Sequence, residues 1–201
     1  MELVDVLRRR RMVRRFDPDR PVPDDVVTAL LAAALRAPTA GDTQAVSFLV
    51  LSDPADLEAY WQATARPGPP DRWLQGMRTA PLLVLVWTSR EAYLDRYAEP
   101  DKGWVDRDPD RWSAPYWFVD AGMASMAALL AVVDAELGGC FFGVPVGRVP
   151  EVRRRFDVPE DQLSVGVISV GYPEVAENPR PARKVRRQPS APRVHHGHWS
   201  L

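Results

Sequence analysis

Three runs rich in apolar residues are the strongest constraint on the fold of this chain of 201 residues. They are VSFLVL at 46–51, PLLVLVWT at 81–88 and LSVGVISVGYP at 163–173. Successive side chains of a strand point to opposite faces of a sheet, so a run with little polar alternation belongs to a strand covered on both faces. The first two runs therefore predict buried strands and the third a further strand, in a small sheet with helices around it.

Four segments have apolar residues at helical spacing, and they are 2–11, 23–35, 53–63 and 119–137. We expect Asp24 to cap the second helix and an Asp-Pro pair to begin the third. Gly138 and Gly139 are expected to end the fourth. Helices outnumber strands, and no repeat or linker divides the chain. These features predict an α+β or α/β sandwich.

Charge and composition exclude several classes of function. Lys and Arg number 26 and Asp and Glu 27, a formal net charge of −1, so the chain lacks the basic surplus of a general nucleic-acid binder. A single cysteine, Cys140, permits neither an intramolecular disulfide nor a cysteine-only metal site. His195, His196 and His198 have no acidic or thiol residue in the adjoining segment, so we expect no metal.

The sequence shows no signal for export or membrane insertion. MELVDVL lacks a basic start followed by an apolar core, and the apolar run at 121–133 is shorter than the roughly 20 residues that span a bilayer. We therefore expect a cytoplasmic protein without a membrane or nucleic-acid partner. The Rossmann GxGxxG pattern, the Walker A loop and the GxSxG elbow are also absent.

Nine residues near the N-terminus, RRRRMVRRF at 8–16, contain six arginines. Such a run is commonly a solvated face. Here it follows a predicted helix, whose C-terminal dipole favours positive charge, and it leads into the aromatic residue and turn of RRFDPD. Guanidinium groups bind phosphate through paired donors. The run is therefore a candidate phosphate site, with a solvated basic surface as the alternative.

Four stretches, in this order, resemble the FMN-dependent nitroreductase family. The arginine run is similar to the family's opening motif, and ALRAPTAGDTQAVSFLVL is similar to its Ala-Pro-Ser/Thr-x-x-Asn-x-Gln segment and following strand. DAGMASMAALLAVVDAELGGCFFG resembles the central helix and the Gly-rich turn after it. VGVISVGYPE with the basic tail resembles the last core strand and the C-terminal arm. The resemblance covers nearly the whole chain.

The resemblance implies an α+β sandwich with a central, mostly antiparallel sheet flanked by helices. It implies an intertwined homodimer with two FMN molecules at its interface. Residues 1–201 would form one domain, with 91–118 as a lid-like insertion and 174–201 as an extended C-terminal arm. The small residues along 119–137 would let a second helix approach closely at the dimer interface, although they could equally pack an internal core.

The resemblance also assigns residues to the phosphate end of the flavin. Arg10, Arg11 and Arg14 would meet the ribityl phosphate and the pyrimidine edge. Met12 stands beside them where the family often has Ser, so one hydroxyl contact is lost. Arg187 in the tail would be a second basic contact with the phosphate.

A second group would reach the flavin from the partner chain. Pro38, Thr39 and Ala40 would pass along it. Asp42 stands where the family often has Asn, and an ionised carboxylate can only accept a hydrogen bond, from flavin N3–H or from an arginine. Gln44 matches the family and would contact the ribityl chain or the ring edge.

The segment 91–118 carries seven aromatic residues among many acids. As a lid, it would place Trp104 and Trp112 over a flat substrate, with Lys102 as a cation for a carboxylate or phosphate. The alternative is a surface excursion with its own small core.

The implied activity is that of an FMN-dependent NAD(P)H oxidoreductase with ping-pong kinetics. Phe142 and Gly143 would present a backbone N–H to flavin N5, which takes hydride from the nicotinamide. A small flat acceptor, such as a nitroaromatic compound or a quinone, would then take the electrons. No catalytic side chain is assigned. The alternative is a flavin- or deazaflavin-binding protein, for storage or flavin consumption, without nicotinamide turnover.

Overall fold

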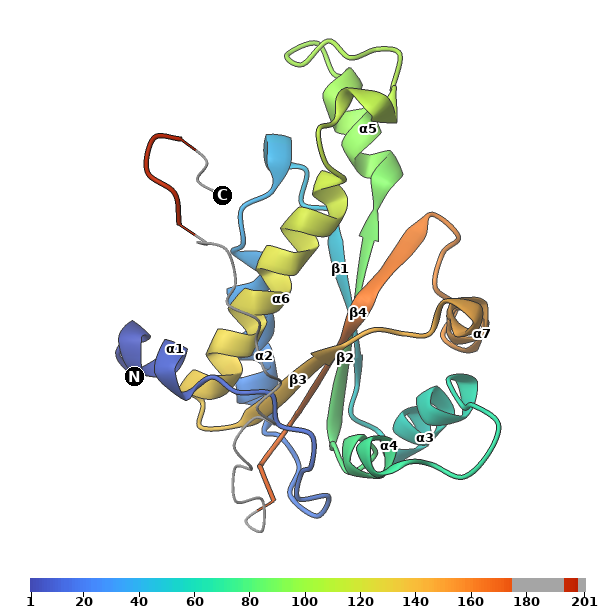
Figure 1. The fold of residues 1–201 in the computed structure, drawn as a ribbon. Helices are drawn as coiled ribbons and strands as arrows, with labels where there is room; N and C mark the ends of the chain where they lie inside the picture. Colours follow the sequence, from blue (N-terminus) through green and yellow to red (C-terminus); the bar gives the residue numbers. More distant parts are fainter. Residues whose placement is uncertain (175–193, 199–201) are drawn as a thin grey trace.

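A computed structural model describes residues 1–174 and 194–198 of the chain. At its centre is a four-stranded sheet in the order β1-β2-β4-β3 (Figure 1). The strands are β1 (Val46–Leu51), β2 (Leu82–Ser89), β3 (Gly138–Phe142) and β4 (Gln162–Gly171). Each pair of neighbouring strands is antiparallel. The predicted α+β class with a mostly antiparallel sheet is confirmed.

Strand β2 is buried along its whole length, as its unbroken apolar run predicts. Its alternate residues belong to two different cores. Leu82, Val84 and Val86 face one side of the sheet, and Leu83, Leu85 and Trp87 face the other. Both faces are therefore covered, and the sheet is the middle layer of a sandwich.

Helices on the two faces supply these outer layers, with α2 and α6 on one face and α3, α4 and α7 on the other (Figure 1). Helix α5 projects beyond one end of the sheet. The helices are α1 (Leu3–Arg9), α2 (Asp24–Leu35), α3 (Pro54–Ala63), α4 (Arg72–Met77), α5 (Arg90–Ala98), α6 (Tyr116–Asp134) and α7 (Val149–Arg155). Three 3-10 turns accompany them: η1 (Ala40–Asp42), η2 (Pro109–Arg111) and η3 (Val146–Arg148).

Helix α6 is the longest of these helices, with 19 residues, and is long and apolar enough to cross a membrane by length and composition alone. It is longer than the apolar run 121–133 indicates. Ala121, Ala124 and Ala128 are buried together with Leu129, and the helix packs against α2 and the sheet. A core helix has this composition on its buried side, so packing within the protein accounts for that face of α6, whereas Val119, Met123 and Met126 are exposed on another.

Two local predictions are wrong. Asp24 does not cap α2: the N-cap position is Pro23, no side chain caps the helix, and Asp24 is the first helical residue. Its carboxylate still lies at the positive end of the helix dipole. Gly138 and Gly139 do not end α6, which stops at Asp134 and is followed by Glu136 at φ 60°.

The two glycines instead begin β3, for a steric reason. A Cβ atom at Gly138 would lie 2.7 Å from Val13 Cγ2, so a side chain here would collide with the N-terminal segment. The sequence also does not predict α4, α5 and α7, which add cover at the ends of strands. Helices α4 and α7 have six and seven residues, which is too short for a clear period.

Candidate active site

The arginine-rich segment at 10–16 lies along the beginning of β3. The Val13 N–H donates to the Gly139 carbonyl oxygen at 3.0 Å. Val13 and Phe16 are 4% and 1% exposed, so they anchor the segment in the core. Arg14 remains exposed between the two anchors. The guanidinium groups therefore extend from a backbone that is fixed on both sides.

The six arginines of the run divide into paired and unpaired groups. Arg15 forms an ion pair with Glu174, and Arg8 lies 3.7 Å from Asp5. Within the described part of the chain, four have no carboxylate within ion-pair distance: Arg9, which donates to the Met1 sulfur, and Arg10, Arg11 and Arg14. The last three are the arginines that the resemblance assigns to the cofactor.

Strand β3 and helix α4 lie beside this segment. Met12 pairs with Gly139 in an isolated bridge, and its side chain is partly exposed. Burial raises the pKa of the Cys140 thiol, and the positive charge of Arg14 opposes that shift. The Arg14 carbonyl oxygen would lie 2.3 Å from a Cβ atom at Gly76, so α4 touches the backbone at Arg14.

Phe142 and Gly143 line a cavity of about 240 Å³ at the end of β3. The end of α3, the loop 64–71 and the start of α4 form the opposite wall. Trp61 stacks on Phe142 with ring centroids 6.1 Å apart, and Trp73 meets the same ring edge-on at 5.6 Å. A Cβ atom at Gly143 would meet nothing within 4 Å, so the backbone there is open to a ligand.

Sequence reasoning missed the wall formed by α3 and α4. The available signal was the group of aromatic residues on both sides of PGPP at 67–70. Trp61 has its Nε1 atom buried without a hydrogen-bond partner in the described residues. Burial also raises the pKa of the Tyr60 hydroxyl, which therefore stays protonated. Arg66 and Asp71 add one charge of each sign to the cavity wall.

Residues 38–44, named the 38–44 loop below, connect α2 to β1 and contain η1. Gly41, Asp42 and Gln44 have φ values of 66°, 55° and 51°, and such values are uncommon for residues other than glycine. The Gln44 side-chain amide donates to Asp42 Oδ1 at 2.7 Å, and its backbone N–H donates to Thr39 Oγ1 at 3.1 Å. Asp42 therefore faces Gln44 rather than an arginine. Pro38 is exposed at the start of the loop.

The 38–44 loop and the arginine segment contact different elements: the loop bonds to α5 and α6, whereas the segment bonds to β3 and touches α4. Thr39 and Gln44 line a second cavity of about 200 Å³ with Phe48 and Ala124. Phe48 packs in the core of α2 and α6, whereas Val13 and Phe142 pack in the core of α3, α4 and α7. The arginine segment thus lies at the beginning of β3 and Phe142–Gly143 at its end, and α4 borders both. The structure does not bring the 38–44 loop of the same chain to them.

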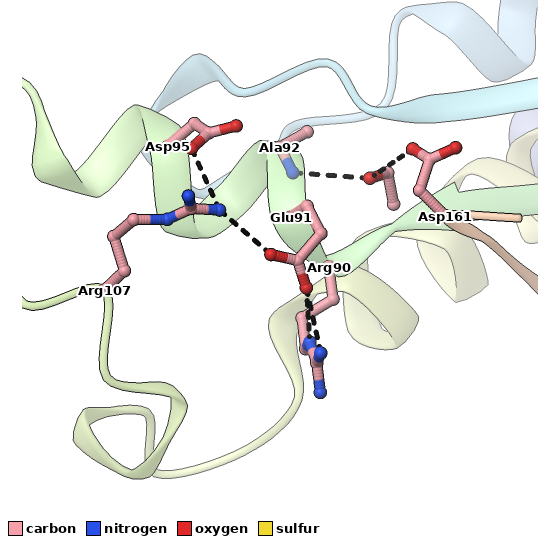
Figure 2. A network of polar contacts seen from close by, with 7 residues as sticks. Arg90, Glu91, Ala92, Asp95, Arg107 and Asp161 are labelled. Carbon is pink, nitrogen blue, oxygen red and sulfur yellow. Dashed lines mark hydrogen bonds and ion pairs between the residues drawn. The ribbon is translucent and has the colours of Figure 1, made fainter.

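The predicted lid, residues 91–118, comprises α5, η2, the connecting loops and the first turn of α6. Figure 2 shows the polar network that holds its loop against α5. Arg107 donates to Glu91 Oε2 at 2.9 Å and lies 3.0 Å from Asp95 Oδ1, and Glu91 also accepts from Arg90. Because these side chains are solvent-exposed, each pair contributes at most about 1 kcal/mol.

The aromatic residues of this segment pack on one another around Trp112. The Trp112 ring centroid lies 4.3 Å from that of Tyr97, 5.4 Å from Trp104 and 6.0 Å from Tyr93. Lys102 Nζ lies 5.4 Å from the Tyr97 ring centroid. This arrangement is a small aromatic core of its own. A role of Lys102, Trp104 and Trp112 in covering a substrate stays a prediction.

Two further predictions concern the tail and metals. Arg187 and most of the predicted arm 174–201 lie outside the described residues. In residues 1–174 and 194–198, no group of three or more His, Cys, Asp or Glu side chains could hold a metal ion.

Comparison with known proteins gives consistent matches over this architecture. The profile of the Nitroreductase family matches residues 7–172. A protein from Methanothermobacter thermautotrophicus named "Putative NADH dehydrogenase/NAD(P)H nitroreductase" is 30% identical over 183 residues, which are 89% of this chain and 80% of the relative.

Solved structures of similar fold are also found. The crystal structure of "Putative NADH Oxidase" from Clostridium acetobutylicum is 25% identical and superposes with a TM-score of 0.69, over 97% of this chain and 100% of that one. A structure from Desulfovibrio desulfuricans, described as a "putative nitroreductase in complex with fmn", has 23% identity and a TM-score of 0.64, over 96% and 99%. It shares the fold. The match to the family profile, which spans most of the sequence, shows that the chain belongs to the nitroreductase family.

Proposed function

We propose that the protein is an FMN-dependent oxidoreductase that takes hydride from NADH or NADPH and passes electrons to a small flat acceptor. The acceptor class would be nitroaromatic compounds, quinones or similar molecules, and the kinetics would be ping-pong. The observation that carries the proposal is the set of unpaired arginines near a cavity with aromatic walls. Relatives named as an NADH dehydrogenase/NAD(P)H nitroreductase and an NADH oxidase support the nicotinamide substrate.

The residues around β3 fit FMN in charge and in chemistry. Guanidinium groups bind phosphate by charge-assisted hydrogen bonds, and Arg10, Arg11 and Arg14 have no competing carboxylate in the described residues. Trp61, Trp73 and Phe142 offer apolar surface for a flat ring. FMN, when bound, would supply the redox chemistry that no side chain of this chain can provide.

A second copy of the chain would complete the site. The cavity of about 240 Å³ is smaller than the roughly 300–1,000 Å³ of typical small-molecule sites, so one chain offers only part of the enclosure. The 38–44 loop, which contacts α5 and α6 rather than the arginine segment, would reach the cofactor held by the partner. In a homodimer of this kind, each chain contributes the arginines to one site and the loop to the other.

Exposed apolar side chains support the dimer. Val119, Met123 and Met126 are 43%, 39% and 44% exposed on one face of α6. Helix α1 adds exposed apolar residues of its own: Leu3, Val4 and Leu7. Contiguous exposed apolar surface on a chain is typical of an interface. Association through these helices would bury it.

The side chains of the protein would bind, orient and exclude water. The arginines would hold the phosphate and fix the position of the cofactor. A Cβ atom at Gly143 would meet nothing within 4 Å, so a ligand could approach the backbone whose N–H is expected at N5. Asp42 accepts from the Gln44 amide, so the Gln44 carbonyl oxygen remains available as an acceptor. The aromatic walls would exclude water from the transferred hydride.

The first test is the visible absorption spectrum of the purified protein, with identification of any released chromophore. Arg10→Ala and Arg14→Ala should each weaken FMN binding by about 1.5–3 kcal/mol, the value of one charge-assisted contact. Arg154→Ala, an exposed arginine of α7 that pairs with Glu151, is the matched control and should leave FMN affinity unchanged. Equal affinity in all three variants would contradict the phosphate site.

The second test is anaerobic mixing of the FMN-loaded protein with NADH and with NADPH. Loss of the yellow colour with either nucleotide supports the proposed reaction. A flavin that stays oxidised with both would favour the alternative, a flavin- or deazaflavin-binding protein without nicotinamide turnover.

A further inference from the structure

Asp120 of α6 is a buried carboxylate with no assigned role. The residue is 1% exposed. Its Oδ2 atom accepts two hydrogen bonds, one from the Ala40 backbone N–H at 2.7 Å and one from the Tyr93 hydroxyl at 2.7 Å. In the described part of the chain, no Lys, Arg or His lies within ion-pair distance of it. A buried carboxylate without a cation is stable only when hydrogen bonds satisfy it.

The two donors come from two segments that are distant in sequence. Ala40 lies in the 38–44 loop, and Tyr93 lies on α5 within the predicted lid. The Tyr93 ring is fully buried and packs against Trp112 and Trp117. Burial and the bond to Asp120 raise the pKa of the Tyr93 hydroxyl, so it stays protonated and able to donate. Asp120 therefore links the loop, α5 and α6 at one oxygen atom.

Two further contacts join the loop to α5. Arg96 Nε donates to the Gly41 carbonyl oxygen at 2.8 Å. A Cβ atom at Gly41 would lie 2.7 Å from Tyr97 Cε2, so the loop backbone lies directly on the Tyr97 ring. Gly41 also has φ 66°, a conformation that glycine adopts without strain. The loop is thus held at two successive residues, Ala40 by Asp120 and Gly41 by α5.

The next residues of the loop have backbone conformations that need such support. Asp42 and Gln44 have positive φ, and residues in this region keep their conformation when surrounding contacts determine it. Both are residues expected to meet the flavin. Losing the bond at Ala40 would release the loop from α6 and leave the positive-φ residues held from one side only.

We propose that Asp120 is a positioning residue for the cofactor: its carboxylate fixes the 38–44 loop to α6 and α5 in the conformation that receives the flavin. This proposal depends on the proposed flavin function. It assigns a second role to the aromatic segment, because α5 and its ring cluster support the loop from behind. The segment then affects the cofactor even where its rings do not touch it.

Four variants test the role. Asp120→Ala removes the acceptor of both hydrogen bonds, whereas Asp120→Asn keeps a carbonyl oxygen in the same place. Asp120→Leu combined with Tyr93→Phe removes the carboxylate and its buried hydroxyl donor together at similar volume, and serves if Asp120→Ala does not fold. Ser125→Ala is the matched control, since Ser125 is another buried polar residue of α6 and bonds only to Ala121 within its own helix.

Two readouts separate positioning from general stability. Hydrogen exchange of the Ala40 amide in the FMN-free protein reports the bond to Asp120 directly. The FMN dissociation constant reports its consequence. For Asp120→Ala and the double variant, we expect exchange at Ala40 and the dissociation constant each to rise by about tenfold, the factor for one lost hydrogen bond. Asp120→Asn should stay within about threefold of the parent, and Ser125→Ala should match it.

Three results would overturn the proposal. The first is faster exchange at Ala40 with unchanged FMN affinity. The second is equal loss of affinity in Asp120→Asn and Asp120→Ala, because the acceptor geometry would then be irrelevant. The third is an equal loss in Ser125→Ala, which would mark a general weakening of α6. A parent protein that does not bind FMN would instead refute the proposed function itself, and the parent titration distinguishes that case.

Discussion

Replacing Gly76 by alanine should disturb the arginine segment without touching any arginine side chain. Gly76 lies in α4, and a Cβ atom there would stand 2.3 Å from the Arg14 carbonyl oxygen. Real Cβ contacts essentially never fall below 3.0 Å. The atom in contact belongs to the backbone rather than to a flexible side-chain end. Either α4 or the segment at Arg14 must therefore move by at least the difference between these two distances.

Two effects of opposite sign set the magnitude for Gly76→Ala. Overpacking a filled site costs about 1–3 kcal/mol. Alanine in a helix is favoured over glycine by about 1 kcal/mol. The net expectation is a loss of about 0–2 kcal/mol of unfolding free energy, or up to about 8 °C in melting temperature for a chain of this size. FMN affinity should fall as well, because the Arg14 backbone shifts.

The assay is thermal unfolding of the FMN-free protein together with FMN titration. Gly147→Ala is the matched control, since a Cβ atom at that exposed position of η3 would meet nothing within 4 Å. A Gly76→Ala protein that melts above the parent would refute the predicted collision. A variant that loses stability but binds FMN normally would refute the position of Arg14 in the cofactor site.

Three other predictions concern the lid, the interface and the thiol. Trp112→Ala should lower the melting temperature more than Trp104→Ala, since the Trp112 ring contacts more neighbours, and both should alter acceptor kinetics; lost stability with unchanged acceptor preference would contradict a lid. The double variant Met123→Glu/Met126→Glu should be a monomer by light scattering and should bind FMN more weakly in a titration. A parent protein that is an FMN-loaded monomer would contradict the shared site. Cys140 should react slowly with a thiol reagent in the native protein and rapidly in urea, because burial raises its pKa; rapid native reaction would contradict that burial.

The sequence predicts the parts of the fold whose signal is local. The run 46–51 coincides with β1, and 81–88 differs from β2 by one residue at each end. β2 is identifiable because its burial on both faces makes its sequence almost continuously apolar, whereas β1 is only partly buried and is recognised from its short apolar run. Strand β3 is missed because it begins with Gly138 and Gly139, and the contacts that exclude a side chain at Gly138 come from Val13. Those contacts are distant in sequence and leave no local pattern.

The same limit applies to the site. The arginine motif is recognisable in sequence, but the sequence cannot tell which arginines are already neutralised. Arg15 is paired by Glu174, which lies at the other end of the chain. The resemblance likewise predicts both halves of the cofactor site, whereas only the fold shows that within one chain they contact different elements, β3 and α4 for the arginine segment and α5 and α6 for the 38–44 loop. Asp120 is one of two buried polar residues in the mostly apolar helix α6, and its two hydrogen-bond donors become neighbours only through folding.

The distribution of unpaired charge favours one small anion over a polymer. A nucleic-acid surface needs cations along an extended path, since phosphates repeat along the strand. Among the six arginines of the run 8–16, the four without a carboxylate partner in the described residues lie within 9–14, and the other two are paired. In the second basic cluster, Arg153 donates to two backbone carbonyl oxygens and Arg154 pairs with Glu151. The local pairing of the arginines, rather than the net charge of −1, therefore supports a single phosphate group as their ligand.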